Sequence, residues 1–241
     1  MRTLRVGRVR LGVCSLAVMA LAALAPASAS EIGSTVLVVR TVTGTLETQT
    51  RQLVIHDDVA QNEVIATAPD AASEIEFIDG TKLSLGPRAK VVLDKFVYDP
   101  DPSKGKFFLT VSEGVFRFAT GHMDHQSYAI TTPNGTLGVR GTEFNFVVFH
   151  DKTIVQVLDG EVIGSSEDHL PRSFLRGAYF TLFHTTGPSS DDDKSVIDAQ
   201  VGLMDALIGG PVRFAGGPPP SNGTDPFQTF NKPLSVSPTH P

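Results

Sequence analysis

The segment TPNGTLGVRGTEF, residues 132–144, constrains the fold of this chain more than any other stretch. Its glycines Gly135, Gly138 and Gly141 recur every third residue, and a strand-like run follows them. A phosphate-binding glycine loop would open a helix, whose N-terminal N–H groups hold the anion, and would contain Gly-Lys-Ser/Thr. This segment precedes a strand-like run and has no Gly-Lys-Ser/Thr. The segment therefore indicates a structural corner between strands, where Arg140 could tie carbonyls or a carboxylate with its five donors. A recognition role for this corner is the alternative.

Short apolar runs, rich in β-branched and aromatic residues, extend from Ser34 to about Phe183. Several of them alternate polar and apolar residues, which is typical of strands with one buried face. Three acidic–glycine pairs recur at strand ends: Asp79-Gly80, Glu113-Gly114 and Asp159-Gly160. Such pairs favour corners with positive φ, where glycine has no Cβ penalty. We predict an all-β domain over residues 30–186, built from short antiparallel, corner-linked strands.

The first 29 residues have the pattern of a secretory signal peptide. Four arginines precede the apolar run 11–25, and Ala27-Ser-Ala29 offers a cleavage site. The run is shorter than the roughly 20 residues that span a bilayer, so a retained anchor is the less favoured alternative. Cys14, the single cysteine, would leave with the leader, so the mature chain could form no disulfide and hold no thiolate metal site.

Removal of this leader would change the formal charge from −6 to −10, because it holds four arginines and no acidic residue. An acidic chain repels nucleic acid and anionic lipid surfaces, so we expect neither as a partner. No segment after residue 30 approaches a transmembrane length. We expect export to the periplasm, with the extracellular space as the alternative.

The composition changes at about Gly187. Residues 187–241 are polar and rich in proline and glycine, which predicts a disordered tail. Within the tail, residues 195–208 place apolar side chains at nearly helical spacing before Gly209-Gly210. We predict one short amphipathic helix there, which we expect to dock on its own domain rather than on a partner. Truncation at about residue 187 is expected to leave the β domain folded.

None of the candidate chemical motifs assembles a convincing site. His122-Met-Asp-His125 could offer metal ligands but reads as a polar loop. The stretch 99–110 resembles a calcium loop, yet its glycine is one place late and its twelfth residue is Thr110 instead of glutamate. His56-Asp57-Asp58 has no G-x-S-x-G nucleophile to orient. We therefore expect no metal, no cofactor and no enzymatic activity.

Four elements in order over about residues 53–163 resemble the FecR-like family, the periplasmic domain of ferric-citrate-type sensors. The segment 132–144 fits T-P-x-x-x-x-G-V-R-G-T-x-F, and residues 79–91 fit D-G-[ST]-x-L-x-L-x-P-x-[ST]-x-V with Ala89 in place of the hydroxyl residue. Residues 111–116 and 157–162 fit the two remaining glycine elements. The motif residues, structural or interacting, are Thr132, Pro133, Gly138, Arg140, Gly141, Thr142, Phe144, Asp79, Gly80, Gly114 and Gly160.

The resemblance implies a β-solenoid-like stack of short strands and a role in sensing. Membrane-bound members of that family have a cytoplasmic region and a transmembrane helix and signal to a sigma factor, whereas this chain begins with a leader. It resembles a stand-alone exported form. We expect an exported, non-enzymatic module that binds a protein or envelope component in signal transduction. The alternative is a secreted structural or glycan-binding β protein, although the chain has no tryptophan and only three tyrosines.

Overall fold

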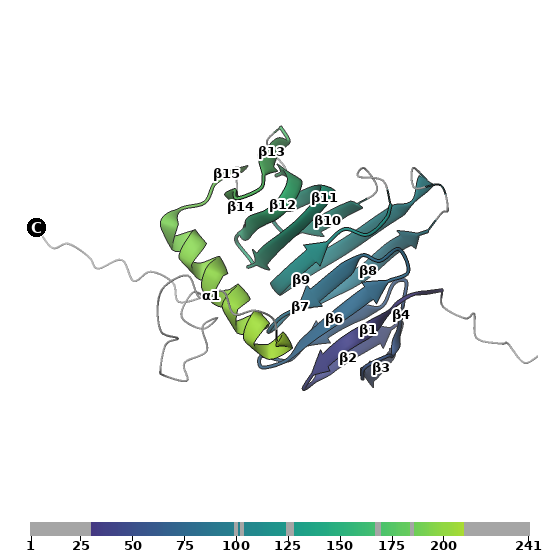
Figure 1. Ribbon diagram of the computed structural model, residues 1–241. Coiled ribbons are helices and arrows are strands. Elements are labelled where there is room, and N and C mark those ends of the chain that lie inside the picture. Colours follow the sequence, from purple (N-terminus) through teal and green to yellow (C-terminus); the bar gives the residue numbers. More distant parts are fainter. Residues whose placement is uncertain are drawn as a thin grey trace, which may run out of the picture.

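The computed structural model describes residues 30–98, 101, 104–123, 128–166, 170–183 and 186–209. The expected leader, His125, most of the loop 99–103 and the chain beyond residue 209 lie outside these ranges. The described residues form one twisted sheet and one helix, α1 (Asp191–Ile208) (Figure 1).

The fifteen strands within these ranges follow one another along the chain in short steps. They are β1 (Glu31–Val39), β2 (Val42–Leu46), β3 (Gln49–Gln52), β4 (Asp58–Ala60), β5 (Val64–Thr67), β6 (Ala72–Phe77), β7 (Lys82–Leu85), β8 (Lys90–Val97), β9 (Lys106–Ala119), β10 (Tyr128–Thr132), β11 (Gly135–Val148), β12 (Thr153–Ser165), β13 (Arg172–Leu175), β14 (Tyr179–Leu182) and β15 (Thr186–Pro188).

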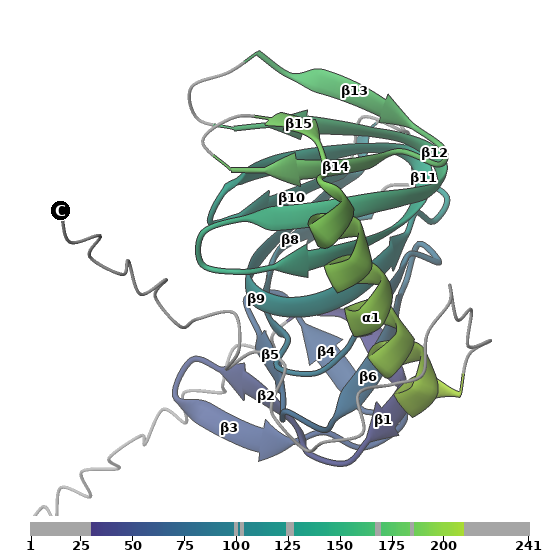
Figure 2. The ribbon, with the colours of Figure 1, turned by 90° about the vertical axis from the view of Figure 1, so that its left-hand side faces the viewer.

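Three long strands, β9, β11 and β12, run through both layers of the fold. Their halves near 106–113, 135–140 and 161–165 join β13, β10, β8, β5, β2 and β3 in one layer, which we call the outer layer. Their other halves join β15, β14, β7, β6, β1 and β4 in a second layer, which we call the helix layer. Figure 2 shows the strands stacked from β1 at one end to β13 at the other.

Glycines occupy the points where these long strands bend. Gly114, Gly141 and Gly160 all have positive φ, at 110°, 55° and 74°. The acidic–glycine pairs therefore have the backbone that the sequence predicts. Two of the three, at Gly114 and Gly160, bend a continuous strand rather than separating two short ones, because hydrogen bonding to neighbouring strands continues on both sides of the bend. Only Gly80, with φ 81°, lies in a turn between two strands.

Aromatic side chains fill the space between the two layers. Phe107 of the outer layer contacts Phe77 of the helix layer edge-on, with ring centroids 4.8 Å apart, and lies 5.7 Å from Phe118. Both halves of β9 thus face each other across the core. Phe144, Phe146 and Phe116 continue this cluster and are fully buried. The burial of large aromatic rings makes this cluster a main source of stability.

The helix α1 crosses the outside of the helix layer, from the β14–β15 end toward β6 and β1 (Figures 1 and 2). Ser190 caps its first turn by accepting a hydrogen bond from Asp193 N, and Gly209 ends it with φ 73°. The helix starts four residues earlier than the predicted 195–208 and ends where predicted. It docks on its own domain, as expected.

Two features of the predicted architecture differ from the structure. The sheet is not closed, and a solenoid-like arrangement is not confirmed, because the two layers are connected through bent strands. In addition, β15 and α1 lie beyond residue 185 and pack onto the sheet, so the packed region extends into the predicted tail.

Candidate functional site

The signature segment spans the end of β10, the turn before β11 and the bend of β11 at Gly141, which lies against the bend of β12 at Gly160. A Cβ placed on Gly160 would overlap the carbonyl oxygen of Gly141 and lie 2.9 Å from Thr142 Cα. The Thr142 hydroxyl lies 2.8 Å from the carbonyl oxygens of both Arg140 and Glu161, and it accepts the Glu161 N–H at 3.1 Å. The two bent strands are therefore locked together by backbone contact and by one buried hydroxyl.

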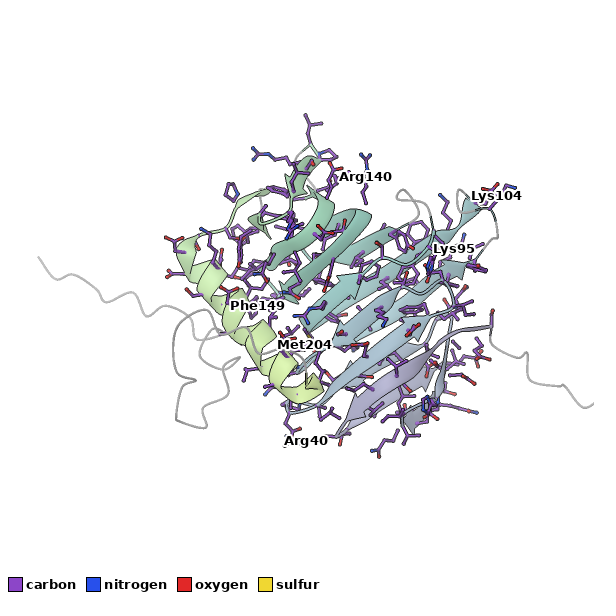
Figure 3. The ribbon with its side chains drawn as sticks, in the orientation of Figure 1. Arg40, Lys95, Lys104, Arg140, Phe149 and Met204 are labelled. Carbon is purple, nitrogen blue, oxygen red and sulfur yellow. The ribbon has the colours of Figure 1, made fainter. Side chains whose placement is uncertain are left out.

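Arg140 does not tie buried groups across this bend. Its side chain is 47 % exposed, and its Nη1 lies 3.7 Å from Glu161 Oε2. At that distance and exposure the pair is a surface ion pair of small energy. Of the two partners that the sequence offered Arg140, carbonyls or a carboxylate, the structure places it beside the Glu161 carboxylate, whereas the Thr142 hydroxyl serves the carbonyl oxygens. Arg140 instead stands on the surface, away from α1 (Figure 3).

The remaining residues of the signature lie in the core or in a hairpin turn. Thr132 is buried; its hydroxyl donates to Gly135 O at 3.0 Å and receives hydrogen bonds from Asn134 N and the Thr153 hydroxyl. Pro133 stands exposed in the same turn. Gly138 has space for a Cβ, with Ile163 Cβ 3.6 Å away. Phe144 is fully buried, so these residues are placed to build the fold.

A second buried network surrounds Asp79, which is 2 % exposed. One carboxylate oxygen accepts hydrogen bonds from the Thr81 hydroxyl at 2.7 Å and the Tyr128 hydroxyl at 2.8 Å, and the other accepts from Thr81 N. Burial raises the pKa of Tyr128 to about 12. His122 approaches Asp79 O with Nδ1 at 2.7 Å. Every partner in this network serves another protein group, so its arrangement closes the turn after β6.

Gly114, in the family element 111–116, lies against Ala89 of the element 79–91. A Cβ on Gly114 would lie 2.7 Å from Ala89 N and closer still to Ala89 Cα. Ala89 is the residue that replaces the hydroxyl side chain of the family pattern, and its N–H donates to Thr67 Oγ1 at 2.8 Å. The bend of β9 is thus packed directly on the loop that precedes β8.

The outward side of the outer layer carries a row of uncharged side chains, which we call the hydroxyl row. Strand register aligns one residue from each of eight neighbouring strands, and none of the eight is buried. In spatial order they are Thr50, Thr45, Val64, Val92, Thr110, Thr131, Thr136 and Ser165. Neighbouring strands lie about 4.8 Å apart, so the row presents regularly spaced β-branched and hydroxyl groups. Sequence reasoning missed this row, because only register reveals it.

The side beneath α1 carries charged and amide groups that the sequence analysis also missed. Arg117 of β9 meets Asp205 with Nη1 2.8 Å from Oδ1, and Asn145 accepts from Arg117 Nε at 2.8 Å. Lys152 Nζ lies 2.6 Å from Asp193 Oδ1. Burial opposes ionisation of Asp193, but its hydrogen bond and attraction to Lys152 outweigh it and lower its pKa. The acidic residues of α1 were the one sequence signal for these contacts, but their partners are distant in the sequence.

The motifs that suggested chemistry do not come together. Asp57 accepts the Val54 N–H at 2.8 Å, which makes it a turn residue, and Asp58 begins β4. Among the described residues, no group of three or more potential metal ligands converges. In the same part of the chain, no helix combines the length and apolar character needed to cross a bilayer. What the surface does offer is the hydroxyl row, the exposed bend at Arg140 and the α1 interface.

Comparisons with known proteins match part of this chain to one family model. Residues 63–163 match the family model described as FecR protein. Two crystal structures of a candidate anti-sigma factor from Parabacteroides distasonis are similar, with TM-scores of 0.44 and 0.45 and identities of 15% and 17%. Each similarity covers 56% of this chain and 63% or 62% of the solved chain, which is less than two thirds of its length. No curated protein matches the chain.

Proposed function

We propose that this chain, which carries a FecR domain over residues 63–163, is an exported module that binds a protein component of an envelope signalling system. The FecR domain is the observation that carries the proposal, and it supports a role in signal transduction. Export is proposed from the leader pattern of residues 1–29. We propose protein binding rather than catalysis because the buried polar groups around Asp79 and Thr142 hydrogen-bond to other groups of the fold.

The alternative, a glycan-binding or structural role, gains one specific observation. The hydroxyl row is uncharged and crosses eight strands, and Phe108 lies exposed two residues before Thr110. An uncharged row of hydroxyls beside an aromatic ring suits a neutral polyhydroxyl polymer, because it offers hydrogen bonds without desolvating a charge. Glycan binding is therefore the second candidate function.

Expression with the native leader tests export. We expect the mature protein in the periplasm or medium, beginning at about Ser30. Retention of Met1 in the membrane fraction would show that the leader is an anchor and would remove the exported form of the proposal.

Affinity capture from an envelope fraction separates the two functions. The bait is the full mature chain, and the matched control is Thr110→Lys/Thr131→Lys, which places charges on the hydroxyl row. Under the main proposal one protein is captured equally by both baits and neither is retained on envelope polysaccharide. Retention on polysaccharide that the control loses would instead assign the glycan-binding role.

A further inference from the structure

We propose that the sheet face beneath α1 is a docking site for an acidic amphipathic helix, and that α1 occupies this site as an intramolecular ligand. This inference rests on the proposed protein-binding function and specifies the kind of partner. We call the site the α1 face and define it by six residues of β9, β11, β12 and the turn before β12: Val115, Arg117, Val147, Lys152, Ile154 and Gln156.

The α1 face and α1 itself lie in different parts of the chain. The six residues of the face lie within the FecR domain, residues 63–163, whereas α1 (Asp191–Ile208) and its further partners Tyr179 and Thr181 of β14 lie beyond it. A surface of the shared domain is thus covered by an element that the domain does not include. When α1 dissociates from the face, other helices can bind there.

The chemistry of the face is complementary to an acidic helix. The cations Arg117 and Lys152 receive Asp205 and Asp193, at 2.8 Å and 2.6 Å. Between them, the Gln156 amide donates to Asp198 Oδ1 at 3.3 Å. Every charged or amide donor in this series belongs to the α1 face, and every acceptor on the helix is an aspartate.

The apolar part of the contact is narrow and follows helical spacing. Ile197, Val201 and Met204 of α1 pack on Val115, Val147 and Ile154, and Met204 lies between α1 and the sheet (Figure 3). Residues at these intervals form one stripe along a helix, flanked by the three aspartates. Any helix with this stripe and acidic flank presents the same contacts. Gln200 Oε1, by contrast, is buried without a hydrogen-bond partner among the described residues, so α1 is not a complete fit.

The connection of α1 keeps the face occupied in the isolated chain. Only Ser189 and Ser190 separate it from β15, and Gly209 ends it. A helix held by one short tether binds its own domain at an effective concentration of about millimolar, so a partner in trans must outcompete it. The face is therefore closed in the isolated chain and opens when a stronger acidic helix, or a change at α1, displaces the intramolecular one.

A peptide of the chain's own helix tests the site in the full mature chain. The probe is a fluorescent peptide of residues 189–209, and the helix-side variant Asp193→Asn/Asp205→Asn weakens α1 without touching the face. We expect the peptide to bind this variant at least about tenfold more tightly than the wild-type chain, because the intramolecular competitor is lost. Hydrogen exchange of the α1 amides reports whether α1 has been released.

Two matched controls complete the test. Adding Arg117→Gln to the variant should return peptide binding to the wild-type level, and a peptide carrying Asn at 193 and 205 should bind at least about tenfold more weakly. If the α1 amides stay protected, Met204→Asp serves instead, because it places a charge in the apolar contact. Equal binding to the wild-type chain and to a variant with released α1, or binding that survives Arg117→Gln, would overturn the proposal. Failure to capture an envelope protein would leave this result intact, because the probe is the chain's own helix.

Discussion

Gly160 of β12 lies directly against Gly141 of β11, and a Cβ at residue 160 would overlap the Gly141 carbonyl oxygen. Both residues have positive φ. The contact couples the bend of the signature segment to the bend at the later Asp159-Gly160 pair. It also allows the two layers to share the same long strands.

Gly160→Ala should destabilise the domain by about 3 kcal/mol, because the new methyl group overlaps backbone and the residue keeps a left-handed φ. Urea unfolding of the full chain measures this. Gly177→Ala is the matched control, since Gly177 has φ 83° but no atom within 4 Å of an added Cβ. It should cost about 1 kcal/mol. Equal losses in the two variants would mean that φ alone, and not the contact with Gly141, matters at residue 160.

Arg140→Ala should change stability by less than about 1 kcal/mol, because the side chain is 47 % exposed and its ion pair with Glu161 is long. Thermal unfolding of Arg140→Ala and Arg140→Lys should coincide with that of the parent. Thr142→Val provides the contrast, because it removes the hydroxyl that serves Arg140 O, Glu161 O and Glu161 N. We expect it to cost about 1–3 kcal/mol. A large loss in Arg140→Ala would restore the sequence-based role of Arg140 in the corner.

Met204→Ala should cost about 2–4 kcal/mol, because Met204 is fully buried between α1 and the sheet, beside Val115 and Gly86. Leu203→Ala on the same helix is the control, since Leu203 is 42% exposed. It should change stability by less than about 0.5 kcal/mol.

Because α1 packs on the sheet, truncation at about residue 187 should lower the melting temperature, contrary to the expectation from composition. An unchanged melting temperature after that truncation would show that α1 contributes nothing to the fold.

The Asp193–Lys152 pair should make stability depend on acid pH. The folded-state pKa of Asp193 is lowered from its ordinary value of 3.8, so its contribution is fully present above pH 3.8 and is lost as pH falls through the folded pKa. The melting temperatures of the parent and Asp193→Asn should therefore differ at pH 7 and converge below pH 3.8. Lys152→Gln should remove most of that difference. A gap that stays constant from pH 7 to the acid limit would contradict the ion-pair account.

The corners of this fold could be predicted because their cause is local. An acidic residue followed by glycine at a strand end favours positive φ whatever surrounds it, and Gly80, Gly114 and Gly160 have that backbone. The helix could be predicted in part, since Ser190 and Gly209 mark its ends in the sequence itself. Its start was placed too late because the three aspartates 191–193 resemble a solvated loop, although acidic residues suit a first helical turn.

What the tertiary structure decided depends on residues that are far apart in the chain. Arg117 and Asp205 are 88 residues apart, so no local pattern could pair them. Alternation indicated a strand at Thr110, whereas Thr136 lies in the segment that the sequence indicated as a corner, and only inter-strand register aligned both with Thr131 in one row. The sequence by itself determined the strands, the corners and the FecR pattern, because backbone preference and side-chain alternation act over a few residues. Which surfaces are open, and which one α1 covers, was decided by packing, because burial is a property of neighbours that meet only after the strands have bent.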